Sequence, residues 1–209
     1  MTFEWIWITV LAVLLIAWRV VRPLVGFLYG PAIAAKALAA QPDHIHLEPL
    51  ADEAWSDAAT RDRRSREIAA FGFREAGGFT VRELPGVKLK LFANAPDSTY
   101  AVVYEHPKAG AWFEFACRFT DASSCTWTTA PSTGLDPRPG HPVRHVPNAS
   151  VATLWKCVAR ERPARPAQPV SVVGAAADFE TAWAESIAWR KQQGISRAEV
   201  AQVAMRKAA

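Results

Sequence analysis

Histidines are the residues of this chain that most readily bind a metal or act as a general base. His141 and His145 lie four residues apart, a spacing that brings two imidazoles together only on a helix, and Pro142 between them argues against that helix. No carboxylate or cysteine follows at the spacing of a metal ligand. We therefore expect no metal site, and we interpret these histidines, together with His44 and His46, as loop residues.

Cysteines are the candidate nucleophiles. The three cysteines, Cys117, Cys125 and Cys157, have the spacing of neither a zinc ribbon nor a CxxC redox motif. A reactive thiolate needs an electropositive, partly exposed position, whereas a thiol inside a hydrophobic strand is inert. We expect reduced, buried thiols, and a disulfide between Cys117 and Cys125 on neighbouring strands is the alternative.

Basic residues within predicted strands form the candidate binding site. Arg82, Lys88, Lys90 and Arg118 are expected to point outward from one face of a sheet, with Trp112 among them. Such a face could bind an anionic lipid headgroup, a phosphate or an acidic partner protein. The alternative is an ordinary solvated sheet face, which also carries lysine and arginine.

Motifs that would define a reaction or a cofactor are absent from the sequence. Asp97, Glu105, Glu114 and Asp121 are scattered, so no spacing predicts an acid/base pair. We find no glycine-rich phosphate loop, no GxSxG elbow and no HExxH motif. The sequence predicts no catalytic residue and no cofactor.

The sheet that would position the basic residues is predicted between Phe73 and Ala130. Hydrophobic and polar residues alternate there, and turn residues separate five runs rich in β-branched and aromatic side chains. The runs are Phe79–Leu84, Val87–Ala93, Thr99–His106, Trp112–Thr120 and Ser124–Thr129. We predict a five-stranded antiparallel meander.

Alternation along these runs predicts one inner face and one outer face. The side chains expected on the inner face are Leu89, Leu91, Tyr100, Val102, Tyr104, Phe113, Phe115, Cys117, Phe119, Cys125 and Trp127. Helices are expected to cover this face alone, which makes the fold class α+β with helices packed on one face of the sheet.

Helices are predicted on both sides of this segment. The first runs from about residue 51 to 70, and its charged run Arg61 to Glu67 is expected to face solvent, with contact to anionic lipid as the alternative. Asn148 or Ser150 is expected to cap a second helix, whose stripe comprises Val151, Leu154, Trp155 and Val158. A third is expected near residues 178–193, and Ser196-x-x-Glu199 predicts a capping box that opens the last helix.

The N-terminal segment predicts a membrane anchor. From Trp5 to Val21 the chain is almost free of polar residues. At about 1.5 Å per residue, a helix over the about 20 residues from Thr2 to Val21 spans a bilayer core of roughly 30 Å. Arg19 and Arg22 flank its C-terminal end, which by the positive-inside rule places the N-terminus outside and the domain in the cytoplasm, at the inner membrane. We expect an anchor (1–23), a juxtamembrane segment and linker (24–50) and one α+β domain (51–209).

Composition excludes few function classes. The 209 residues are 50% hydrophobic and 21% charged, and the net charge of +4 is too mild and too dispersed to predict nucleic-acid binding. We predict a single-pass, membrane-anchored binding or interaction module without catalysis, whose partners are the bilayer and either anionic lipid headgroups or a membrane protein. The alternatives are a hydrolase with its site in the loop 131–147 and a structural subunit of a membrane complex.

Overall fold

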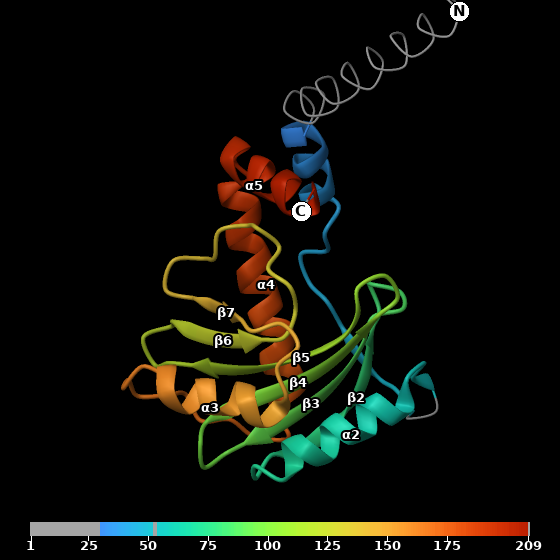
Figure 1. Cartoon of the computed structure of the whole chain (residues 1–209), viewed down its shortest axis with the longest axis vertical. Coiled ribbons are helices and arrows are strands. Elements are labelled where there is room, and N and C mark those ends of the chain that lie inside the picture. The colour runs from blue at the N-terminus through green and yellow to red at the C-terminus, as the bar shows by residue number, and fades with distance from the viewer. Residues whose placement is uncertain (1–29, 52–53, 209) are drawn as a thin grey trace, which may run out of the picture. The chain divides into compact units, whose positions relative to one another are not determined.

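The computed structural model describes residues 30–51 and 54–208 (Figure 1). The chain divides into two compact units. The larger comprises residues 42–132 and 137–189, and the described part of the smaller comprises residues 30–41, 133–136 and 190–208. All candidate site residues lie in the larger unit.

A seven-stranded mixed sheet forms the larger unit. The strands are β1 (Leu47–Pro49), β2 (Arg74–Val81), β3 (Lys88–Asn94), β4 (Thr99–His106), β5 (Gly110–Arg118), β6 (Ser124–Thr128) and β7 (Val143–His145). They lie in sequence order, and each consecutive pair is antiparallel except β6 and β7, which are parallel.

The prediction of a five-stranded, purely antiparallel sheet is wrong. Two short strands that the sequence does not indicate extend the sheet at its edges, β1 from the predicted linker and β7 from the proline-containing loop. Both are three residues long, too short to show an alternating pattern. The loop after Thr128 carries the chain back before Val143, so β7 runs parallel to β6.

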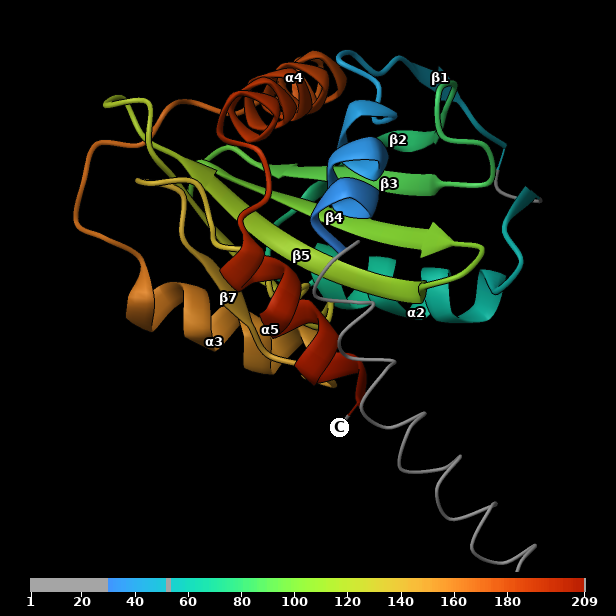
Figure 2. The same cartoon turned by 90° about the horizontal axis from the view of Figure 1, so that it is seen from above.

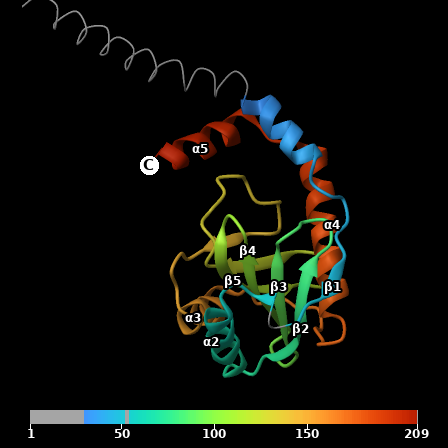
Figure 3. The ribbon, with the colours of Figure 1, turned by 90° about the vertical axis from the view of Figure 1, so that its right-hand side faces the viewer.

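Helices cover both faces of the sheet, which corrects the prediction of a single covered face. Helices α2 (Ala58–Ala69) and α3 (Val151–Glu161) lie on one face, and α4 (Ala175–Gln193) lies on the other (Figures 2 and 3). A sheet between two helical layers can bury every residue of a central strand, so alternation between apolar and polar residues is no longer required.

The strand register decides which residues share a face. Val102 pairs with Glu114, and Val103 pairs with Phe113. Directly paired residues point to the same face, so Val102 lies on the side opposite Phe113. The predicted inner face is therefore divided between two cores.

One core lies under α2 and α3 and the other under α4. The first contains Ile68, Phe73, Phe92, Ala101, Val103, Phe113, Phe115, Cys117, Phe119, Cys125, Trp127, Val151, Leu154 and Val158. The second contains Ile45, Val81, Leu89, Leu91, Val102 and Ala175, with Tyr100, Tyr104, Phe179 and Trp183 packed around them.

The membrane-spanning helix of the predicted fold class is not supported. Its residues, Trp5 to Val21, lie outside the described residues. Over residues 30–51 and 54–208, no helix combines the length and the apolar character that crossing a bilayer requires.

The smaller unit contains a helical stretch over residues 30–39 and α5 (Arg197–Ala208). The predicted capping box is confirmed: the Ser196 amide donates to Glu199 at 2.8 Å, and the Glu199 amide donates to the Ser196 hydroxyl at 3.2 Å. Glu199 also binds Arg190 at 2.8 Å and the Asp136 amide at 2.9 Å. Burial raises the pKa of Glu199, but these hydrogen bonds outweigh burial and hold it at about 2.

Candidate functional site

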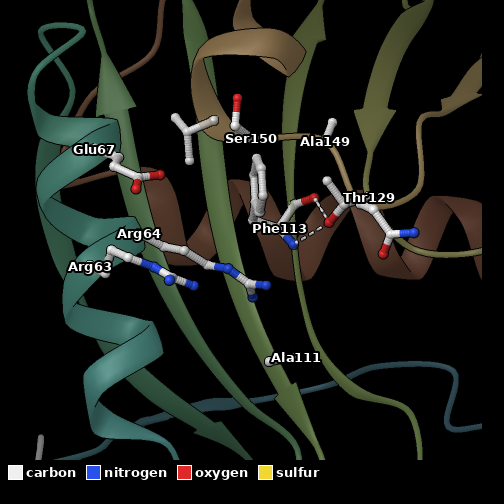
Figure 4. A pocket seen from close by; sticks show the side chains of 10 residues that line it. Arg63, Arg64, Glu67, Ala111, Phe113, Thr129, Ala149 and Ser150 are labelled. Atoms are coloured by element: carbon white, nitrogen blue, oxygen red, sulfur yellow. Dashed lines mark hydrogen bonds between the residues drawn. The ribbon is translucent and has the colours of Figure 1, made fainter.

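A polar pocket of about 420 Å³ opens between α2, β5 and the start of α3 (Figure 4). Side chains from four separate segments line it, so it exists only in the folded larger unit. The lining residues are Arg63, Arg64, Glu67, Ala111, Phe113, Thr129, Asn148, Ala149, Ser150 and Val151.

Helix α2 turns two of its arginines toward the sheet. Arg61, Arg64 and Ile68 lie at positions i, i+3 and i+7, and Arg61 and Ile68 are buried. Arg61 lies over the Trp55 ring, with its guanidinium carbon 5.7 Å from the ring centroid. The prediction that the whole charged run faces solvent is therefore wrong, because Arg61 and Arg64 lie on the side of α2 that packs against the sheet.

Arg64 reaches across the pocket to the floor formed by β5. Its guanidinium carbon lies 5.4 Å from the centroid of the Phe113 ring, a cation–π arrangement (Figure 4). The Phe113 amide donates to the Thr129 hydroxyl at 3.0 Å, and that hydroxyl donates to the Phe113 carbonyl at 3.2 Å. These bonds hold the strand that carries the ring.

The field in the pocket is positive. Burial lowers the pKa of Arg64, and the neighbouring charge of Arg63 lowers it further, while Asp57 and Glu67 act in the opposite direction. Both guanidiniums keep their protons at neutral pH. Burial disfavours an anion as well as a cation, so only the repulsion between Arg63 and Arg64 indicates a preference for an anion.

One nitrogen of Arg64 lacks an acceptor. Its Nη1 atom is buried and makes no hydrogen bond, and neither Arg63 nor Arg64 forms an ion pair within the described part of the chain. A buried donor without a partner costs about 1–3 kcal/mol. An oxygen acceptor within reach of this atom would remove this cost.

The N-terminus of α3 forms the opposite wall. Ser150 is its N-cap, as one of the two predicted alternatives, and its hydroxyl accepts from the Thr153 amide at 3.1 Å. Asn148, two residues before Ser150, adopts a left-handed conformation with φ of 61°. The helix is anchored by the buried side chains of Val151, Leu154 and Val158, so its positive end is held at the pocket.

The structure separates the five residues of the predicted basic face. Lys88 and Lys90 lie on the face that α2 covers, because they pair with Glu105 and Val103. Lys88 forms an ion pair with Glu105 at 2.6 Å, and Lys90, which is 4% exposed, forms one with Glu75 at 2.9 Å.

The other three predicted residues lie elsewhere. Arg118 binds Glu185 of α4 at 2.9 Å, so it belongs to the opposite face. Trp112 stacks on Tyr104 on that same face, with 4.7 Å between the ring centroids. Arg82 follows β2 and pairs with Glu48 at 2.6 Å. None of the five lines the pocket.

The loop histidines also have structural partners. The His141 ring lies 2.8 Å from the Ser124 hydroxyl, and the His145 ring donates to the Ala130 carbonyl at 2.9 Å. Burial and the nearby charge of Arg138 lower the pKa of His141. Across the described residues, no three histidine, cysteine, aspartate or glutamate side chains are grouped to hold a metal ion.

Sequence reasoning missed Arg64 as a site residue. The available signal was helical spacing: Arg64 lies four residues before the buried Ile68, and therefore on the same side of the helix. Phe113 and Thr129 carry no such signal, since the sequence does not reveal that α2 crosses above them.

The fold and site together define an α+β protein with a cationic pocket beside a helix N-terminus. No protein-family model matches the chain, and no curated protein or solved structure matches it.

Proposed function

We propose that the larger unit is a non-catalytic binding module whose pocket takes up the phosphate group of a small molecule. Arg64 carries the proposal, because its buried Nη1 lacks an acceptor at the wall of a cavity that also contains Arg63. An arginine binds a phosphate oxygen through a charge-assisted hydrogen bond.

Donors approach this space from two sides. The guanidiniums come from α2, and the N-terminal turn of α3, whose Thr153 amide is capped by Ser150, forms the opposite wall. A phosphate has three terminal oxygens and can accept from both walls at once, and helix N-termini stabilise such an anion. A carboxylate has only two oxygens in one plane, so it satisfies fewer of these donors.

The size and lining of the pocket favour binding over catalysis. A volume of about 420 Å³ lies within the range of roughly 300–1,000 Å³ that small-molecule sites occupy. Glu67 is the one acid among the ten lining residues, and they include neither histidine nor cysteine. This set offers charge and hydrogen bonds but no acid/base pair.

The phosphate could belong to a free metabolite or to the headgroup of an anionic lipid. The two sources share the recognition chemistry, so the test includes both. Placement of this domain at the inner membrane, a membrane-protein partner, the hydrolase alternative and the structural-subunit alternative stay predictions from the sequence.

The test is calorimetric titration of the full-length chain with glycerol 3-phosphate, alongside sedimentation with vesicles of phosphatidylglycerol or phosphatidylcholine. We expect Arg64→Gln to weaken phosphate binding at least about tenfold, which corresponds to 1.4 kcal/mol. Arg66→Gln is the matched control, since it removes the same charge from an exposed position of the same helix.

Three outcomes separate the possibilities. Loss of titration in Arg64→Gln alone supports a soluble phosphate ligand. Binding only to phosphatidylglycerol vesicles, again lost in Arg64→Gln, assigns the pocket to a lipid headgroup. Equal weakening by Arg64→Gln and Arg66→Gln, or no binding in either assay, overturns the proposal, because the net charge alone would then account for the result.

A further inference from the structure

Cys117 and Cys125 lie directly opposite each other on β5 and β6. The Phe119 amide donates to the Ser123 carbonyl at 2.9 Å, and the Thr129 amide donates to the Phe113 carbonyl at 3.0 Å. Because close and wide pairs alternate along an antiparallel ladder, these two bonds identify the cysteines as a hydrogen-bonded pair.

The Cα separation of such a pair permits a disulfide, but only a strained one. The Cα atoms of a hydrogen-bonded pair are about 5.5 Å apart, and disulfides join Cα atoms that are roughly 4.4–6.8 Å apart. Its Cβ atoms lie toward the upper end of about 4.5–5.5 Å, whereas those of a disulfide are roughly 3.5–4.5 Å apart, so the cross-link would be strained and readily reduced. Paired residues point to the same face, so both thiols lie in the core under α2 and α3. Both cysteines are free in this structure.

The thiol of Cys117 can rotate toward Cys125 without leaving a polar group unsatisfied. Its Sγ lies 3.2 Å from the hydroxyl of Thr99, on the neighbouring strand β4. That hydroxyl already donates to the Asp97 carbonyl at 2.9 Å and accepts from Arg162 at 3.3 Å. The contact with Cys117 is therefore dispensable.

We propose that Cys117 and Cys125 form a site of reversible disulfide modification, which reacts by exchange with a low-molecular-weight disulfide. Cys125 is the entry point because it is 8% exposed, whereas Cys117 is fully buried. Its thiolate attacks one sulfur of the small disulfide, the S–S bond breaks, and one small thiol leaves with a proton.

The second step closes the protein disulfide. The Cys117 thiolate attacks the Sγ of Cys125 in the mixed disulfide, and the second small thiol leaves with a proton. The two cysteines are oxidised by two electrons in total, and the small disulfide is reduced to two thiols. Burial raises the pKa of both thiols, so the exchange is slow and follows local opening of the strand pair.

The cross-link would lie close to the pocket floor. The pair Phe115 and Trp127 separates the cysteines from the pair formed by Phe113 and Thr129. Oxidation therefore modifies the same two strands that carry one wall of the pocket, although the proposal does not depend on what the pocket binds.

The test incubates the full-length chain with oxidised glutathione, blocks free thiols with iodoacetamide under denaturing conditions, and maps peptides by mass spectrometry. We expect a peptide linked through Cys117 and Cys125, which dithiothreitol reverses. Cys157, which is partly exposed on α3, is the competing thiol. The variant Cys157→Ser should leave the linked peptide unchanged.

Cys125→Ser keeps the size of the side chain and should abolish the linked peptide. Two results would overturn the proposal. One is complete alkylation of Cys117 and Cys125 after an incubation that converts Cys157 to its glutathione adduct. The other is a linked peptide that joins Cys157 to either partner, because the strand register would then not direct the exchange.

Discussion

Arg64 and Phe113 join a helix to a strand across the pocket, with the guanidinium carbon 5.4 Å from the ring centroid. The ring is 3% exposed, so it forms a fixed floor, and the arginine above it carries the charge that a ligand would meet. The contact links the packing of α2 to the chemistry of the pocket. Each partner can be changed separately.

Phe113→Leu should weaken both stability and phosphate binding. Loss of buried aromatic surface and of the cation–π contact lowers the free energy of unfolding by roughly 1–2 kcal/mol. Urea denaturation measures this change, and calorimetry measures the affinity. Phe115→Leu is the control, because Phe115 is buried in the same core without contacting Arg64. Equal affinities of the two variants would contradict the positioning role of Phe113.

The two pocket arginines should respond differently to salt. Arg63 is exposed and Arg64 is partly buried, so salt screens the charge of Arg63 more strongly. We expect the loss of affinity in Arg63→Gln to shrink toward zero as sodium chloride rises from about 0.05 M to about 0.5 M. The loss in Arg64→Gln should largely persist. Identical salt dependence in both variants would indicate only a diffuse attraction.

Glu114→Gln should stabilise the protein at high pH. Burial raises the pKa of Glu114, and its carboxylate accepts from the Tyr104 hydroxyl at 2.6 Å. A raised folded-state pKa means that the folded state favours the protonated acid, so this contribution is full at low pH and is lost as pH rises through the folded pKa. Glutamine mimics the neutral acid. We expect a melting temperature a few degrees above that of the original protein at about pH 8, and no difference at about pH 4.

Glu105→Gln should have the opposite effect. Burial raises the pKa of Glu105, but hydrogen bonds from Lys88 and from the amides of Asp57 and Ser56 lower it to about 2. A depressed folded-state pKa contributes stability above the ordinary pKa of a glutamate, and that stability is lost as pH falls toward 2. The substitution should cost roughly 1–3 kcal/mol at neutral pH. Thermal melts that show the same cost at every pH would contradict this linkage.

Local signals in the sequence predicted the helix caps. Ser150 caps α3, and Ser196 and Glu199 close a capping box at the start of α5. Strand β4 also begins and ends where its run of aromatic and β-branched residues between two turns predicts, at Thr99 and His106. These features depend on hydrogen bonds and periodicity within a few residues, so a single segment contains the information that determines them.

The sequence did not predict which residues the tertiary structure brings together at the site. Lys90 and Arg118 share a polar character in the sequence, yet the register places them on opposite faces, each against its own acidic partner. Arg64 belongs to a charged run, yet the crossing of α2 places it above Phe113.

The sequence by itself determined the α+β class, the helix caps and the bounds of β4. Only the tertiary structure decided that both faces of the sheet are covered and that α2 and α3 enclose a cationic pocket. The physical reason is that pairing register and helix packing depend on contacts between residues far apart in the chain, and local periodicity does not encode these contacts.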